Sequence, residues 1–179
     1  MKATGIVRRI DDLGRVVIPK EIRRTMRIRE GDALEIYTQA DGEVIFKKYS
    51  PIGELGPCTQ QYAEVLNRTT GMVAVICDRD HIIAASGMSK KDVLNKRVSP
   101  MLESYMERRS SYSYAVDKEA LFVSEEIPRQ VSVMCPIIGA GDVLGAVALL
   151  CEERPSVPSQ TDVKLTQVAS GFLGKQMEE

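Results

Sequence analysis

The sequence lacks any apolar run long enough to cross a membrane. The longest run, Val143–Cys151, has nine residues, whereas a membrane-spanning helix needs about 20. Mixed polar residues follow Met1, where a secretory signal would carry a continuous apolar segment. We therefore expect a cytoplasmic protein with no membrane partner.

Residues that commonly bind metals are also scarce. The chain has one histidine and four cysteines, and no two cysteines form a C-x-x-C pair. Structural zinc sites are built from several such ligands at short spacings. We therefore expect no metal site and no cofactor, and we expect the cysteines to be buried, reduced thiols.

Motifs of several enzyme classes are missing. The chain has no phosphate-binding loop of the form G-x-x-x-x-G-K-[ST], and Gly139-Ala140-Gly141 lacks the third glycine of a dinucleotide fingerprint. A serine triad would need His81 together with Ser86 or Ser132, yet no nucleophile-elbow pattern surrounds either serine. The sequence therefore predicts a protein that is not an enzyme.

The total charge is small, but it is unevenly distributed. Lys and Arg number 24 against 25 Asp and Glu, which gives a net charge of −1. Residues 1–29 contain nine basic and three acidic residues, a net charge of +6, while residues 30–50 carry −3 and residues 51–179 carry −4. This distribution excludes a chain that is basic throughout. Positive charge gathered at one end is instead typical of a domain that binds a polyanion.

Two domains are predicted, separated by a segment rich in proline and glycine. Two prolines and two glycines occur within residues 51–57, and such a segment interrupts helices and central strands. We therefore predict a first domain over residues 1–50, a linker over 51–56 and a second domain over 57–179.

The first domain is predicted to contain short elements: strands at 6–10 and 15–18, a helix at 20–27 opened by Pro19, and a hairpin of strands at 33–37 and 43–48. Only 21 of its 50 residues are apolar. A chain this small rarely closes a core without a metal or a disulfide. We therefore expect this domain to complete its core with a second copy.

A set of arginines gives the strongest functional signal. Six arginines lie within residues 8–27, on the predicted strands and helix of the first domain. A guanidinium group can hold a phosphate, or the O6/N7 edge of guanine, through two hydrogen bonds. Nucleic acid is the favoured partner, while an acidic protein partner and a merely solvated basic face remain alternatives. The candidate DNA-binding residues are Arg8, Arg9, Arg15, Arg23 and Arg24.

The second domain is predicted to mix helices with an antiparallel sheet. Neighbouring strands follow one another in hairpins, which favours an α+β fold. The predicted helices are 59–68, 90–95, 100–109 and 162–176, and the predicted strands are 72–77, 81–85, 113–116, 121–124, 131–138 and 143–151. The last helix carries an apolar stripe of Leu165, Ala169 and Phe172, which could pack within one chain or form a bundle with another copy. The second use would join two dimers into a homotetramer.

The first domain closely resembles the AbrB family of transition-state regulators. The resemblance covers residues 4–19, Ile22-Arg23-Arg24 and residues 31–37, and its most specific part is the Gly-Arg-Val-Val-Ile-Pro core at 14–19. It implies a dimeric swapped-hairpin β-barrel that binds double-stranded DNA. It also implies DNA contacts by Arg8, Arg15, Arg23 and Arg24, with Arg9 at a position that is basic in relatives. The same fold serves antitoxins, so an antitoxin-like protein that pairs with a toxin is the alternative.

The second domain resembles a GAF domain in its topology. That resemblance implies a small-molecule sensor with a pocket between the sheet and its covering helices, although plain core is the alternative for these positions. Some GAF-like domains reduce methionine sulfoxide with cysteines, and this enzymatic alternative stays open. The whole chain resembles sporulation regulators, which implies control of late sporulation genes, with a second domain that senses an effector or sets oligomer geometry. The candidate pocket residues are Val75, Cys77, Ile83, Ser86, Pro136 and Ile138.

Overall fold

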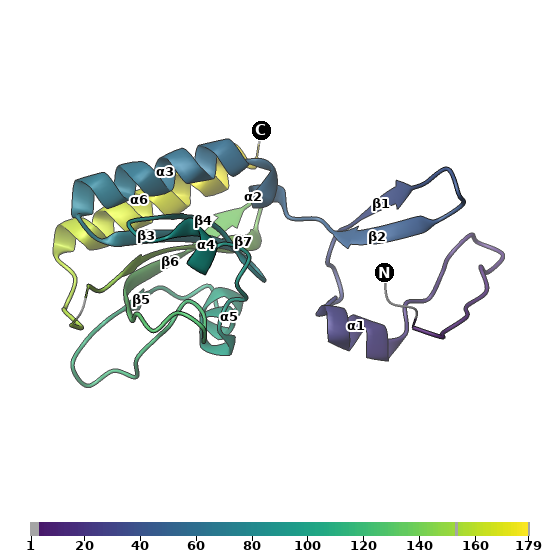
Figure 1. The fold of residues 1–179 in the computed structure, drawn as a ribbon, viewed down its shortest axis with the longest axis horizontal. Helices are drawn as coiled ribbons and strands as arrows, with labels where there is room; N and C mark the ends of the chain where they lie inside the picture. The colour runs from purple at the N-terminus through teal and green to yellow at the C-terminus, as the bar shows by residue number, and fades with distance from the viewer. Residues whose placement is uncertain (1–3, 153, 179) are drawn as a thin grey trace. The chain divides into compact units, whose positions relative to one another are not determined.

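The structure, a computed structural model, describes residues 4–152 and 154–178. It divides into two compact units, and the boundary between them lies between Tyr49 and Ser50. In Figure 1 the N-terminal unit runs from purple to blue and the C-terminal unit from blue to yellow.

The N-terminal unit contains one short helix and one hairpin. Helix α1 (Lys20–Met26) follows Pro19 directly, and it ends where Arg27 adopts a left-handed conformation at φ 51°. Strands β1 (Leu34–Thr38) and β2 (Val44–Lys48) pair in antiparallel fashion. These three elements were predicted from the sequence to within one residue at each end.

The prediction of strands at 6–10 and 15–18 is wrong, because neither segment forms a strand in the single chain. Both segments have irregular backbone, and the hydrogen bonds that join them lie at the turn, where Asp11 N–H donates to the Arg15 carbonyl at 3.0 Å. Their apolar side chains are exposed, with Val7 at 86% and Val17 at 69%. A strand requires a hydrogen-bonded neighbour, and no other described segment of this chain supplies one.

The C-terminal unit is built on a five-stranded antiparallel sheet in the order β4-β3-β7-β6-β5. The predicted antiparallel sheet is therefore confirmed. A strand predicted at 121–124 is wrong, because this segment contributes a single bridge, between Phe122 and Gln130, and otherwise crosses a face of the sheet. The strands are β3 (Val73–Asp78), β4 (Ile82–Ser86), β5 (Tyr112–Ser113), β6 (Val131–Gly139) and β7 (Asp142–Leu150).

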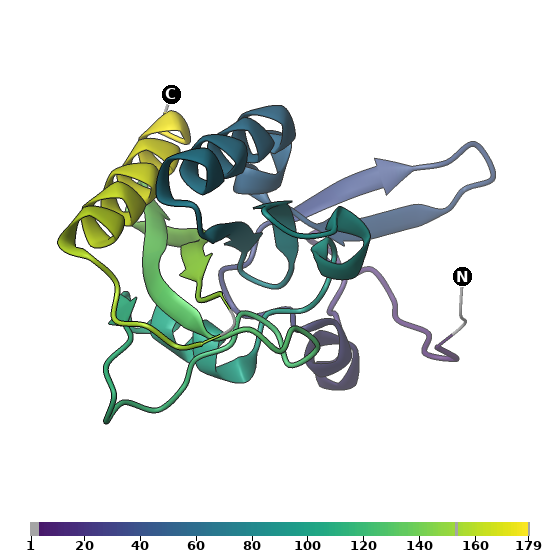
Figure 2. The ribbon, with the colours of Figure 1, turned by 60° about the vertical axis from the view of Figure 1, so that its left-hand side comes forward.

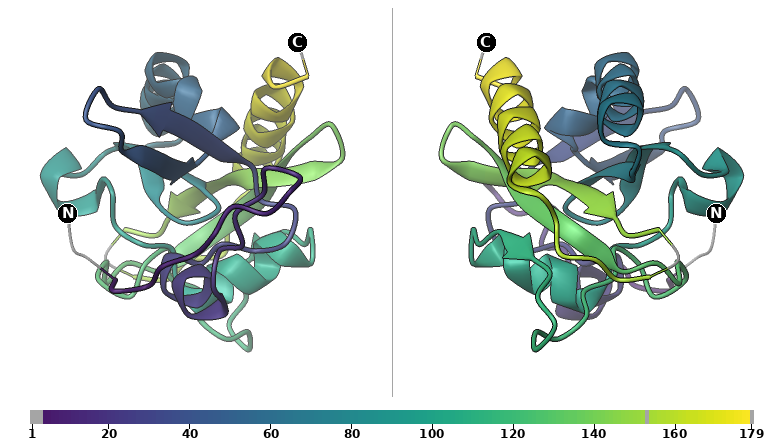
Figure 3. Two further views of the ribbon diagram at one scale, coloured as in Figure 1. Left: turned by 90° about the vertical axis from the view of Figure 1, so that its right-hand side faces the viewer. Right: turned by 90° about the vertical axis from the view of Figure 1, so that its left-hand side faces the viewer.

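Helices cover both faces of this sheet. Helices α3 (Gly56–Thr70) and α6 (Gln160–Gln176) lie side by side on one face, as Figures 2 and 3 show, and they are in contact with each other. Helix α5 (Pro100–Glu107) and the irregular segment 114–130 cover the other face, and α4 (Lys90–Val93) follows β4. The sheet therefore separates two apolar cores, one under α3 and α6 and one under α5.

The segment predicted as a linker, residues 51–56, is largely helical. Residues Pro51–Glu54 form a helical turn, α2, and α3 begins at Gly56. The Ser50 hydroxyl accepts a hydrogen bond from Gly53 N–H, and Ile52 is fully buried in the core under α3 and α6. Proline interrupts a helix only in its interior and is well tolerated in the first turn. The segment therefore belongs to the C-terminal unit.

The predicted stripe of the last helix differs from the buried one by a single position. Ala169 is buried as expected, but Phe172 is 43% exposed, and Leu173 is fully buried instead. The helix approaches β6 closely near its end: a Cβ atom built on Gly174 would lie 2.1 Å from the Ile138 carbonyl oxygen. A residue with any side chain would push the helix away from the strand.

The outer edge of β4 is covered by the chain that follows it. Ile82 N–H donates to the Lys96 carbonyl at 3.0 Å, and Asn95 N–H donates to the Ile82 carbonyl at 2.9 Å. The Gln60 side-chain amide of α3 also donates to the Ala85 carbonyl at 3.2 Å. At the opposite end of the sheet, the edge strand β5 has two residues.

Candidate nucleic-acid interface

Helix α1 displays its basic residues because none of its residues is buried. Arg23 and Arg24 lie in its last turn and are exposed, a position where positive charge also favours the helix dipole. Arg8 and Arg9 lie in the first irregular segment and Arg15 begins the second, and all three are exposed. The five predicted DNA-binding arginines are thus on the surface of the N-terminal unit.

The turn between the two irregular segments holds Arg15 through Asp11. One carboxylate oxygen of Asp11 accepts from Leu13 N–H at 3.1 Å and from Arg15 N–H at 2.7 Å. The other accepts from Arg15 Nε at 2.8 Å. The backbone hydrogen bond from Arg15 is the main cause that lowers the pKa of Asp11, and the side-chain bond from Arg15 adds to it. Gly14, at φ +74°, provides the left-handed residue that closes the turn.

A nearly buried carboxylate ties the end of α1 to the hairpin. The Asp32 side chain is 4% exposed; it accepts from Arg29 N–H at 2.9 Å and lies 3.4 Å from Lys48 Nζ. Lys48 Nζ also donates to the Arg27 carbonyl at 3.0 Å. These contacts fix the helix that carries Arg23 and Arg24 relative to the hairpin. The sequence did not indicate that Asp32 and Lys48 are anchoring residues, because the contacts from Lys48 to Asp32 and to Arg27 span 16 and 21 positions.

The residues predicted to line a pocket in the C-terminal unit lie on two different faces of the sheet. Val75 and Cys77 are buried in the core under α5, and the register places Pro136 beside Ala146 on that same face. Ser86 lies opposite Ala74 on the other face, where its hydroxyl donates to the Asn67 side-chain oxygen at 3.3 Å.

The last two residues of the predicted set separate it further. Ile83 packs against the core under α3 and α6, while Ile138 is 38% exposed. The six residues therefore do not line one cavity. The register shift between Ile76 and Cys77 accounts for Ile83 alone, because it pairs Cys77 with Ile82 instead of Ile83, whereas Ser86 pairs with Ala74 before the shift.

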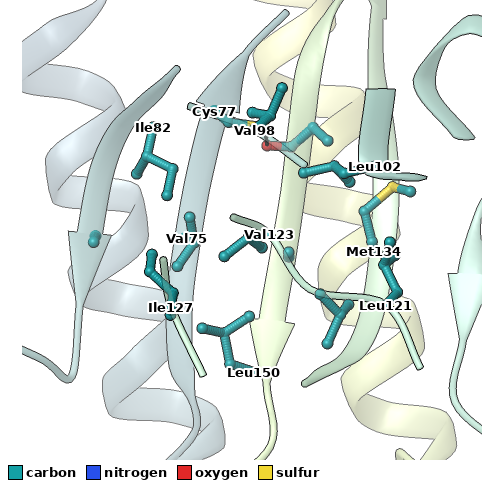
Figure 4. Close-up of a cluster of buried hydrophobic side chains, with 14 of the residues drawn as sticks. Val75, Cys77, Ile82, Val98, Leu102, Leu121, Val123, Ile127, Met134 and Leu150 are labelled. Carbon is teal, nitrogen blue, oxygen red and sulfur yellow. Dashed lines mark hydrogen bonds between the residues drawn. The ribbon is translucent and has the colours of Figure 1, made fainter. Parts of the chain in front are cut away.

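The face under α5 is occupied by the protein's own side chains. Figure 4 shows Val123 and Ile127 of the irregular segment beside Val75, and Leu121 of the same segment near Met134; all five are at most 2% exposed. Burial raises the pKa of the Cys77 thiol to about 12, and burial also raises the pKa of Cys135. Cys77 is thus a protonated core thiol at neutral pH, not a nucleophile.

The residues considered for catalysis are not assembled into a site. His81 directly precedes β4, and Ser86 is the last residue of that strand. At about 3.3 Å per strand residue, the two lie roughly 16 Å apart. The Ser132 hydroxyl is buried and donates to the Ser156 carbonyl at 3.3 Å.

Within the two described ranges, no group of three or more His, Cys, Asp or Glu residues could hold a metal ion. None of the described helices is long and apolar enough to span a bilayer.

Comparison with known proteins identifies the family. The family profile described as "Stage V sporulation protein T C-terminal, transcription factor" matches residues 54–178. The chain is also 52% identical, over 181 residues and 100% of both chains, to stage V sporulation protein T of Bacillus subtilis (strain 168). The chain belongs to the stage V sporulation protein T family. As a member of that family it is a transcription regulator of sporulation and not an enzyme.

The N-terminal unit of this family member has relatives of its own. It is 65% identical over 51 residues to the transition state regulatory protein AbrB of Bacillus subtilis (strain 168), a match that covers 28% of this chain and 52% of that relative. A profile described as "Antidote-toxin recognition MazE, bacterial antitoxin" matches residues 7–53. The predicted AbrB-like DNA-binding domain is therefore confirmed.

The C-terminal unit of this family member has the predicted GAF-like fold. It resembles the GAF domain of an Acinetobacter phosphoenolpyruvate-protein phosphotransferase with a TM-score of 0.56 and 13% identity, covering 69% of this chain and 86% of that one. At this identity the similarity shows the fold alone. The sequence resemblance named both the AbrB-like and the GAF-like part, but it did not reveal the contacts of Asp11 and Asp32.

Proposed function

We propose that two copies of the N-terminal unit join through their exposed apolar residues and present paired arginines to double-stranded DNA. The observation that carries this proposal is the coexistence of two features on one small unit. Its irregular segments expose Val7, Ile10 and Val17 at 68–86%, and the same segments and α1 expose Arg8, Arg9, Arg15, Arg23 and Arg24. Exposed apolar residues favour association, and a second copy would double the arginines across a two-fold axis.

Binding would be electrostatic first, because each arginine that meets a phosphate releases counterions. Sequence preference would come from bidentate contacts of a few guanidinium groups with guanine and from DNA shape. The genes controlled in this way would be those of late sporulation, by analogy with the named relative.

Replacing Arg23 and Arg24 together by alanine should weaken DNA binding by more than tenfold. An arginine in bidentate contact with a base contributes about 1–3 kcal/mol, and 1.4 kcal/mol corresponds to a factor of ten. Where the contacts are to phosphates, the dependence of affinity on salt should also become weaker. The slope of log K against log salt concentration should become less steep by about 0.9 per contact, hence by roughly 3 to 4 for the four arginines lost from a dimer. The measurement is fluorescence anisotropy of a mixed-sequence duplex with the full chain over a salt series.

The matched control is Lys90→Ala/Lys91→Ala, which removes the same charge from two exposed positions of the C-terminal unit. Circular dichroism verifies that both double variants are folded. Equal binding by the wild type and the arginine variant would contradict the proposal. The basic surface would then point to an acidic protein partner, as in the antitoxin alternative.

We further propose that the C-terminal unit sets the geometry of the oligomer through the outer surface of α3 and α6. The rings of Tyr62 and Phe172 stack there with centroids 5.4 Å apart. Val65, Val168 and Phe172 are 55%, 62% and 43% exposed on the same two helices. An apolar surface of this kind on paired helices suits a bundle with a second copy. Two dimers joined in this way would form a tetramer.

Phe172→Glu should convert the full chain from a tetramer to a dimer. Sedimentation velocity should give roughly four times the chain mass of 19.8 kDa for the wild type and about half of that for the variant, because a buried unpaired carboxylate is costly. Val116→Glu is the control, since Val116 is 85% exposed in the loop on the other side of the sheet. A wild type that sediments as a dimer, or a variant that remains tetrameric, would contradict this assignment.

A further inference from the structure

Asp11 is an acidic residue in the middle of the basic segment. Its side chain is 34% exposed and is surrounded in sequence by Arg8, Arg9 and Arg15. A carboxylate at a DNA-binding surface repels phosphates, so electrostatics alone would disfavour it there. The adjacent Asp12 is exposed. Asp11 is distinguished from it by its hydrogen bonds to Leu13 and Arg15.

The two oxygens of Asp11 have different partners. Oδ1 accepts the backbone N–H groups of Leu13 and Arg15, which shapes the turn. Oδ2 accepts Arg15 Nε at 2.8 Å, which fixes the direction of a side chain that is 69% exposed. The Arg15 bond uses Nε–H, and the Nη groups at the end of the fork are those that a phosphate or a guanine edge would meet.

We infer that Asp11 is a positioning residue for DNA binding, whose carboxylate holds the Arg15 guanidinium in place before DNA arrives. This inference rests on the proposed function, because it requires Arg15 to contact DNA. A free arginine side chain loses rotamer freedom when it is fixed on a ligand, and that loss weakens binding. The hydrogen bond to Asp11 already restricts the rotamers of Arg15 in the folded protein, so Arg15 loses less freedom when DNA binds. In this proposal, the resulting gain in affinity exceeds the repulsion between the Asp11 carboxylate and the phosphates.

The test is the substitution Asp11→Asn in the full chain. Asparagine keeps an oxygen that can accept the two turn N–H groups, but its amide nitrogen cannot accept from Arg15 Nε. We expect Asp11→Asn to weaken DNA binding by a few-fold to about tenfold, the range given by fixing one long side chain, although the variant is less negative. Asp12→Asn makes the same charge change one residue away and should leave affinity unchanged or raise it.

A double-mutant cycle isolates the route through Arg15. In an Arg15→Ala background, Asp11→Asn should have no further weakening effect on DNA affinity. Weakening of equal size in both backgrounds would overturn the inference, and so would an Asp11→Asn variant that binds as tightly as Asp12→Asn. In either case a weakened Arg15→Ala variant would leave the proposed function standing.

Two further readouts separate the remaining outcomes. Arg15→Ala binding with wild-type affinity would remove Arg15 from the proposed DNA contacts, and the inference would fall with it. The NMR resonance of Arg15 Nε–H reports the contact without DNA: its exchange with solvent should be slowed in the wild type and in Asp12→Asn, and fast in Asp11→Asn. Equal exchange rates in the three proteins would overturn the inference. That conclusion would hold even if Asp11→Asn altered the backbone of the turn at residues 11–15.

Discussion

Gly174→Ala should destabilise the C-terminal unit by about 3 kcal/mol, at the upper end of the usual range for an overpacked site. The new Cβ atom would lie 2.1 Å from the Ile138 carbonyl oxygen and 2.9 Å from its carbon. Both atoms belong to the backbone of β6, so no side-chain rotation can relieve the clash. The helix must move from the strand or end a turn earlier, and in both cases part of the core around Leu173 is lost.

Gly171→Ala is the matched control in the same helix. Nothing lies within 4 Å of a Cβ atom built on Gly171, and alanine favours a helix over glycine by about 0.5–1 kcal/mol. The two substitutions add the same methyl group three residues apart and should change stability in opposite directions. Thermal unfolding followed by circular dichroism should show a midpoint temperature roughly 10 °C lower for Gly174→Ala than for the wild type. A fall of equal size for both variants would refute the close helix–strand contact.

Ile52→Ala should destabilise the C-terminal unit by about 2–5 kcal/mol, the cost typical of truncating a fully buried isoleucine. Ile52 is 0% exposed in the core beneath α3 and α6, although it lies in a segment that reads as a linker. Urea unfolding of the full chain measures the loss. Val116→Ala, at a position 85% exposed, should change stability by less than about 0.5 kcal/mol. Equal stability of the two variants would mean that residues 51–56 are a free connection.

The sequence predicted those elements whose stability is local or whose pattern is strong. The Asp-Gly pair at 41–42 marks the β1–β2 hairpin, and the long apolar runs at 131–138 and 143–151 mark β6 and β7. The predicted strands at 6–10 and 15–18 are absent, because a strand needs a hydrogen-bonded neighbour and no other described segment of the chain supplies one. In residues 51–56, proline and glycine were taken as breaks, whereas Pro51 starts a helical turn and Ile52 is drawn into the core.

The candidate site was predictable in its residue types but not in its contacts. The arginines were found from their density in the sequence and from the family resemblance, since neither depends on side-chain geometry. The Asp11–Arg15 bond depends on the conformation of one turn, and the Asp32–Lys48 contact depends on how α1 meets the hairpin. The place of Ile83 depends on the register shift between Ile76 and Cys77, which the apolar pattern of the sequence did not indicate.

The covered edges of the C-terminal sheet bear on how many copies can assemble. Residues 95–96 and Gln60 already occupy backbone groups along β4, and β5 offers two residues at the other end. An incoming strand therefore finds part of the β4 edge already occupied, which disfavours strand addition there. In the proposed assembly, association would instead run through the outer surface of α3 and α6. A two-fold contact of that kind uses the same surface on both copies, and it would close the particle at a fixed copy number.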